Sequence, residues 1–218
     1  MGSAPAGVSD PHAIVDEVAA SQARVDAAIA GLDDAAMRQP SRLPGWSVGH
    51  VLTHIARNAD SHVRRTEAAW RGESIDQYPG GFEGRASAID AGAHRPAAEI
   101  VADVRETGAL ADARWRATPD PAWSVVSLDV GGTERALRDL PGRRWQELEV
   151  HLVDLGLGAS HRDWPDAFVA YQLPRMRGSL ARRLPPGVVP PVLDPHDELA
   201  WLYDRFVPAG APALGAWG

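Results

Sequence analysis

The chain has 218 residues, 44% of them hydrophobic and 23% charged, which is the composition of a globular protein rather than a disordered one. Its net charge of −7 disfavours a nucleic-acid-binding surface but leaves room for a local arginine pocket that binds a small anion. The sequence contains no cysteine, so disulfides, thiolate metal ligands and a cysteine nucleophile are all excluded.

The sequence has no run of 18 apolar residues and no charged-then-apolar leader. It therefore predicts neither a transmembrane span nor a signal peptide. We expect a cytoplasmic protein that binds neither membrane nor nucleic acid, and that is a monomer or a homodimer.

Helical periodicity and helix-end signals predict a mainly helical chain. Pro11 and Gly31 bracket a first helix over residues 10–30, and Ser47 is expected to cap a second helix that continues through His54 to about residue 71. Residues 72–84 are predicted to form a loop. Further elements are expected at residues 85–91 (helix), 96–117 (helix), 123–137 (a hairpin that turns at Gly131-Gly132) and 141–156 (helix).

Four of these helices are long enough to form an up-and-down four-helix bundle, in which facing side chains can build a central metal site. After residue 158 prolines become frequent, and we expect a proline-interrupted helix over 164–184 and a last helix over 197–206. The sequence thus predicts a helical domain over residues 1–158 and a small C-terminal subdomain over 159–218, either α/β or irregular.

Glu147 and His151 are the strongest candidates for metal binding on spacing alone. They are four residues apart, so their side chains stack on one face of the predicted helix, beside its apolar arc. Asp154 falls close to the same face and is either an acceptor that orients His151 or a surface acid. Such Glu/His pairs are common on solvated helices, and the absence of an HExxH motif excludes a zincin.

The second helix contains three histidines, and periodicity does not select among them as a partner for that pair. His62 falls inside the apolar arc, His54 lies beside it and His50 is nearly opposite. Helical phase alone would favour His62. Two imidazoles and a carboxylate would nevertheless form the ligand set of an open, catalytic divalent-metal site.

Four segments resemble the actinobacterial mycothiol-dependent maleylpyruvate isomerase family, within the wider DinB-like group. The segments are LPGWSVGHVLTHIARN (residues 43–58), YPGGFEGR (78–85), RWQELEVHLVDLG (144–156) and LAWLYDR (199–205). In the last segment Asp204 stands where the family usually has glycine. The resemblance covers nearly the whole chain and implies a DinB-like four-helix bundle.

The resemblance implies roles for five residues. His54, Glu147 and His151 are implied to bind zinc and to leave a fourth position open for the sulfur of mycothiol. Arg85 and Arg205 are implied to be catalytic and to contact the cofactor and substrate, since guanidinium groups suit carboxylates and developing negative charge. Without the resemblance, Arg85 would be interpreted as a surface arginine and Arg205 as a helix C-terminal cation.

The resemblance also implies an activity, with mycothiol and a small electrophile as partners. A zinc-bound thiolate would add to the cis double bond of maleylpyruvate, and rotation and elimination would give fumarylpyruvate. Two alternatives stay open. One is a mycothiol S-transferase that conjugates the same thiol to an electrophile; the other is a non-catalytic ligand-binding protein with the same bundle.

Overall fold

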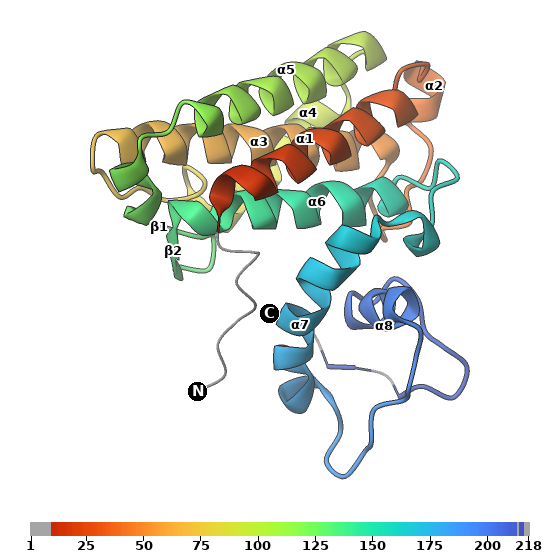
Figure 1. The fold of residues 1–218 in the computed structure, drawn as a ribbon. Coiled ribbons are helices and arrows are strands. Elements are labelled where there is room, and N and C mark those ends of the chain that lie inside the picture. Colours follow the sequence, from red (N-terminus) through yellow and green to blue (C-terminus); the bar gives the residue numbers. More distant parts are fainter. Residues whose placement is uncertain (1–9, 213, 216–218) are drawn as a thin grey trace. The chain divides into compact units, whose positions relative to one another are not determined.

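Helices dominate the computed structural model, which describes residues 10–212 and 214–215 (Figure 1). These residues fall into two compact units that divide between Leu157 and Gly158. The helices of the first unit are α1 (Pro11–Ala28), α2 (Asp34–Met37), α3 (Val48–Trp70), α4 (Gly81–Ala93), α5 (Ala97–Arg116) and α6 (Leu140–Asp154). None of the helices in the described part has the length and apolar character needed to cross a bilayer.

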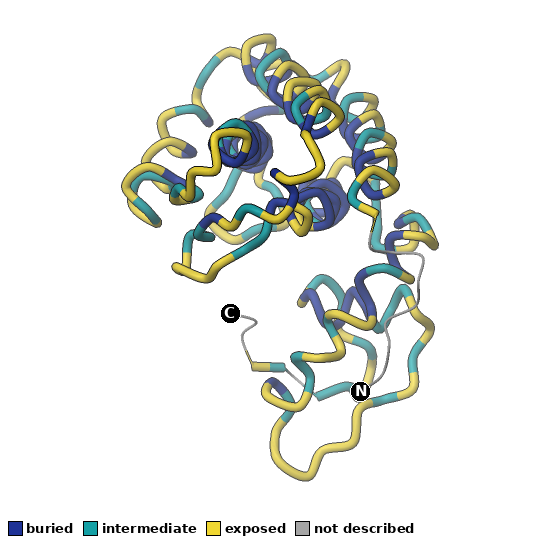
Figure 2. The backbone as a smooth tube through the Cα atoms, turned by 60° about the vertical axis from the view of Figure 1, so that its left-hand side comes forward, coloured by how far each residue is buried: buried dark blue, intermediate teal, exposed yellow. Residues whose placement is uncertain are grey.

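The core of the first unit is a four-helix bundle formed by α1, α3, α5 and α6, as the sequence predicts. Helices α1 and α3 each pack against both α5 and α6, and α4 lies against α3. Most of α3 is buried, and Figure 2 shows the buried stretches concentrated on the helices of this unit. Large side chains such as Trp115, Trp145 and Leu52 fill the interior. The bundle therefore places the first half of α3 against α6, where His54, Ile55 and Asn58 contact residues of that helix.

Helix α3 begins at Ser47, as expected, through a reciprocal capping box. The Ser47 hydroxyl accepts a hydrogen bond from the backbone N–H of His50, and His50 Nδ1 accepts one from the backbone N–H of Ser47 at 3.3 Å. Both bonds satisfy donors that a helix start leaves unpaired. The helix ends before Gly72, which has a positive φ of 71°. This cap fixes the phase of the face that presents His50 and His54.

The prediction for α4 was wrong at its start. The loop expected over residues 72–84 ends early, and α4 begins at Gly81. Gly80 adopts the left-handed region with φ 74°, and a Cβ on Gly84 would lie 1.9 Å from the Pro79 carbonyl oxygen. The glycines that suggested a loop are therefore needed for a tight helix start.

The remaining elements of this unit are short. Strands β1 (Val126–Leu128) and β2 (Glu134–Ala136) form the expected antiparallel hairpin, with Ser127 opposite Arg135 and Gly132 at φ 80°. The hairpin is shorter than predicted because Asp120–Ser124 (η1) and Leu137–Asp139 (η2) are 3₁₀ turns. Helix α2, a single turn capped by Asp33, was not predicted from the sequence.

The second unit contains η3 (His161–Asp163), α7 (Asp166–Arg183) and α8 (Pro195–Leu202). Its described residues include no strand, so it is irregular and helical rather than α/β. Helix α7 contains Pro174, as expected, whereas α8 ends four residues before the predicted end. Asp204 has φ 56°, a left-handed conformation that glycine adopts freely and aspartate tolerates. This explains why glycine suits that position.

We expect Gly49→Ala to destabilise the bundle. A Cβ at Gly49 would lie 2.4 Å from the Ala93 carbonyl oxygen, so α3 and α4 would have to separate. Such overpacking costs roughly 1–3 kcal/mol, measurable as a lower midpoint in urea denaturation. The matched control is Gly31→Ala, whose Cβ would meet no atom within 4 Å. Equal midpoints for the two variants would show that the close approach of α3 and α4 is unimportant.

Candidate metal centre

The bundle brings His54 from α3 against Glu147 and His151 from α6. Nε2 of His54 lies 2.8 Å from Oε2 of Glu147 and 3.1 Å from Nε2 of His151. Nε2 of His151 lies 3.3 Å from the same carboxylate oxygen. Three potential ligand atoms from two helices thus form one small triangle, and the structure assembles the three residues that the resemblance implies as ligands.

The dimensions of this triangle fit a divalent metal ion. In a tetrahedral zinc site each nitrogen or oxygen ligand lies about 2.0–2.1 Å from the metal, which places any two ligand atoms about 3.3 Å apart. The three separations of 2.8, 3.1 and 3.3 Å are close to that value. A set of two imidazoles and one carboxylate suits zinc, iron or nickel and leaves further positions open.

The second ring nitrogens of the two histidines have different partners. Nδ1 of His151 lies 2.8 Å from Oδ2 of Asp154, a fully buried carboxylate, which is the usual arrangement for a ligating histidine. Nδ1 of His54 instead accepts a hydrogen bond from Nη2 of Arg85 at 3.1 Å. A metal on Nε2 requires the proton of neutral His54 to sit on Nδ1. Binding of a metal through Nε2 would therefore compete with the Arg85 contact.

The electrostatics of the triad prepare two of its three members for a metal. Burial lowers the pKa of His54 to about 4 despite its hydrogen bond to Glu147, so His54 is neutral at pH 7. Burial opposes ionisation of Glu147, but hydrogen bonds from His151 and His54 hold its pKa well below its usual range. Burial likewise opposes the charge of His151, yet Asp154 and Glu147 raise its pKa. These two carboxylates therefore favour the protonated form of His151, with which a metal would compete.

The three side chains of the triad differ in their exposure to solvent. The side chain of Glu147 is 26% exposed, against 14% for His151 and 4% for His54, so Glu147 is the most solvent-accessible of the three. A cavity of about 270 Å³ adjoins His54, because Trp46 and Arg85 both line it and both contact the His54 ring. Trp46 meets that ring edge-on, with 5.7 Å between centroids. A ligand in the cavity would thus touch the surroundings of His54.

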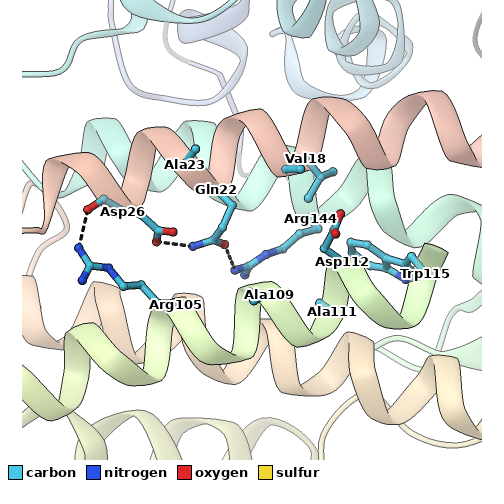
Figure 3. Close-up of a pocket in the computed structure, with 12 residues that line it drawn as sticks. Val18, Gln22, Ala23, Asp26, Arg105, Ala109, Ala111, Asp112, Trp115 and Arg144 are labelled. Carbon is cyan, nitrogen blue, oxygen red and sulfur yellow. Dashed lines mark hydrogen bonds between the residues drawn. The ribbon is translucent and has the colours of Figure 1, made fainter. Parts of the chain in front are cut away.

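Arg144, a buried arginine that was not among the predicted site residues, connects the helices beside the triad through hydrogen bonds. Arg144 lies one turn before Glu147 and donates through Nη1 to the Ile55 carbonyl oxygen at 2.7 Å and to Asn58 Oδ1 at 2.9 Å, both on α3. Through Nη2 it donates to Gln22 Oε1 of α1 at 3.1 Å, across the groove between α1 and α5 shown in Figure 3. Arg144 therefore fixes α3 against α6 where the ligands meet.

The other candidate residues lie elsewhere. His62 is buried beside Trp115, with 5.4 Å between ring centroids, and is a core residue rather than a member of the triad. His50 caps α3 and faces Asp90. Arg205 belongs to the second unit, where its Nη1 donates to the Tyr203 carbonyl oxygen at 2.8 Å.

Comparison with known protein families identifies the family of this chain. Residues 18–156 match the model of the mycothiol maleylpyruvate isomerase N-terminal domain. The chain belongs to this family. The match spans α3, α4 and α6 and so includes all three residues of the triad and Arg85.

Solved structures agree on the fold. The chain is similar to a crystal structure of the mycothiol-dependent maleylpyruvate isomerase, with a TM-score of 0.86 and 20% sequence identity over 95% of this chain and 97% of that one. A histidine-to-alanine mutant of that enzyme gives a TM-score of 0.85 and 19% identity with the same coverage. A search of curated proteins found no significant match.

We expect Asp154→Asn to weaken metal binding. The change removes the negative charge that orients His151 while keeping the side-chain shape, and loss of such partners costs roughly 10- to 100-fold in metal affinity. Titration of metal-free protein with Zn²⁺ measures the effect. Asp139→Asn is the matched control, since Asp139 is exposed at the start of the same helix. Unchanged affinity in Asp154→Asn would show that this carboxylate does not support the metal.

Proposed function

We propose that the protein is a mycothiol- and divalent-metal-dependent isomerase that converts maleylpyruvate to fumarylpyruvate, with zinc as the metal. The triangle of ligand atoms from His54, Glu147 and His151, in a chain of this family, is the main support. The sequence supplies no thiol of its own, which suits an enzyme whose nucleophile comes from a soluble thiol.

The ligand set defines what the metal contributes. When bound, a divalent metal holds a coordinated thiol as its thiolate near neutral pH, and such a thiolate can add reversibly to an activated cis double bond. His54, Glu147 and His151 would hold the metal, and Asp154 would accept a hydrogen bond from Nδ1–H of His151 and keep its ring in place. The 26% exposure of Glu147 leaves space beside the ligands for thiol and substrate.

Arg85 is the candidate for binding the substrate. Its guanidinium lies 3.1 Å from Nδ1 of His54 and 5.9 Å from the centre of the Tyr78 ring, on the wall of the cavity beside the triad. Once His54 holds a metal, Nδ1 carries a proton and no longer accepts from Arg85. The guanidinium is then available for a carboxylate of the substrate and for charge that develops during addition.

Arg205 stays a prediction from family resemblance, as a second cation for substrate or mycothiol. It follows α8 in the second unit, and its backbone N–H donates to the Ala200 carbonyl oxygen at 2.8 Å. This contact and the left-handed Asp204 hold the chain direction at Arg205. The division of the chain into a helical bundle over residues 1–158 that carries the metal site and a small C-terminal subdomain over residues 159–218 is likewise a proposal.

Activity should require the triad. Purified protein with mycothiol and Zn²⁺ is expected to remove the enol absorbance of maleylpyruvate, and Glu147→Ala is expected to abolish both turnover and tight zinc binding because it removes the one anionic ligand. Gln146→Ala is the matched control, since Gln146 is the half-buried neighbour on the same helix.

The alternatives give different results in the same assay. An isomerase needs only a catalytic amount of mycothiol, whereas an S-transferase consumes one thiol per electrophile and leaves a thioether. No turnover of maleylpyruvate would overturn the isomerase proposal. Absence of any bound divalent metal would overturn both catalytic proposals and favour a ligand-binding protein.

We expect Arg85→Met to lower kcat/KM for maleylpyruvate by roughly 10- to 100-fold, because a hydrogen bond to a charged group contributes about 1.5–3 kcal/mol. Arg85→Lys should recover part of the loss, since it keeps the charge but not the bidentate geometry. Arg71→Met is the control, because Arg71 is 58% exposed and pairs with Glu73. Steady-state kinetics with all three variants would contradict the role if Arg85→Met behaved like this control.

A further inference from the structure

A second group of potential ligands lies one helical turn before His54. His50 is in the first turn of α3, Asp90 lies on α4, and His94 caps the C-terminal end of that helix. Each residue offers one ligand atom, and the three atoms all lie within 4.8 Å of one another. Nε2 of His50 lies 3.7 Å from Oδ1 of Asp90, and the rings of His50 and His94 meet edge-on with 5.4 Å between centroids.

The donor set repeats that of the buried triad. Asp90 and His94 are four residues apart on α4, as Glu147 and His151 are on α6, so each pair presents a carboxylate and an imidazole on one helix face. In both groups α3 supplies the second imidazole. The two groups share no residue.

The ring of His50 is already oriented for binding. Its Nδ1 lies 2.8 Å from the Ser47 hydroxyl in the capping box, which leaves Nε2 facing Asp90. Trp46 stacks on the other side of the ring, with 6.3 Å between centroids and 30° between planes. A ligating histidine usually donates its second ring N–H to an oxygen, and the Ser47 hydroxyl can accept from Nδ1–H of His50, in place of the hydrogen bond that Nδ1 accepts from the Ser47 backbone N–H.

We propose that His50, Asp90 and His94 form a second divalent-metal site, distinct from the His54 site. Two imidazoles and a carboxylate select a borderline transition-metal ion such as Zn²⁺, Ni²⁺ or Co²⁺ over Ca²⁺ or Mg²⁺. The side chain of Asp90 is 79% exposed, so binding must order a mobile carboxylate in water. The second site is therefore weaker than the buried one.

The proposed second site adjoins the cavity described above. His50 and Asp90 line that cavity together with Arg85 and Trp46, the two residues that contact His54. A metal at the second site would cross-link the start of α3 to the end of α4 and immobilise part of the cavity wall. It would also fix the side chain of Asp90, which in the described part of the chain pairs with His50.

Zinc titration of the metal-free full chain tests the proposal. Wild type is expected to bind two equivalents, one tight and one weaker. Asp90→Asn and His94→Ala should each weaken the second event by roughly tenfold or more and keep the first, because even residues that only orient ligands contribute that much. Glu147→Ala should do the reverse and keep only the weaker event. Both Asp90 and His94 are exposed, so their replacement leaves the core intact, which circular dichroism verifies.

Asp166→Asn is the matched control. Asp166 is 99% exposed and lies 3.6 Å from Nε2 of His196, but among the described residues it belongs to no group of three potential ligands, so both binding events should persist. A single equivalent in wild type that Glu147→Ala abolishes would overturn the proposal, as would a second event that survives both Asp90→Asn and His94→Ala. Failure of the His54 site would look different, since wild type would then keep one weak event that Asp90→Asn removes.

Discussion

The candidate centre depends on the register of α3 against α6, and the buried guanidinium of Arg144 holds that register. Arg144 is 1% exposed, and it donates hydrogen bonds to neutral acceptors on α1 and α3. Burial lowers its pKa to about 10, which still leaves it charged at neutral pH. Burying a cation is costly unless its donors are satisfied, so the acceptors must stay where they are. Two of them, Ile55 and Asn58, flank the turn that follows His54.

The same arrangement accounts for the charge state of the triad. Glu147 lies one turn beyond Arg144 on α6, and its negative charge favours the protonated guanidinium. Hydrogen bonds from His54 and His151 then use the carboxylate oxygen that a metal would bind. In the absence of metal, these hydrogen bonds hold the ligands close together. A metal at this site would exchange these hydrogen bonds for coordination bonds to ligand atoms that already lie close together.

Much of the fold follows from local sequence signals, and the triad follows only in part. Caps and helical periodicity predicted α3 and α6, and the four-residue spacing identified Glu147 and His151 as a pair. Periodicity favoured His62 because it detects the side of α3 that faces the core, and His62 is indeed buried against Trp115. His54 lies at the border of that face, where a ligand can reach both α6 and the cavity. Only motif resemblance selected it.

Contacts between helices could not be predicted from local sequence patterns, because they depend on how closely the helices pack. The start of α4 was missed because Gly80, Gly81 and Gly84 suggest a loop until the approach of Pro79 is known. The convergence of His50 with Asp90 and His94 depends on how closely α3 and α4 pack, which Gly49 and Gly92 permit through their missing Cβ atoms. Neither the spacing of residues nor the composition of the sequence predicts the distance between α3 and α4.

The two histidine–carboxylate groups differ in burial, and this difference separates the proposed catalytic site from the proposed second metal site. Both contain two imidazoles and one carboxylate, and α3 contributes to both. In the His54 group the carboxylate is 26% exposed and already bonded to both histidines; in the His50 group it is 79% exposed and 3.7 Å from its nearest imidazole. The His54 group would lose little conformational entropy on binding a metal, because its ligands are already ordered. Its low-dielectric surroundings would also strengthen the electrostatic effect of a bound metal on a coordinated thiol. The His50 group must order its ligands in water, so it can bind a metal but activates a thiol less.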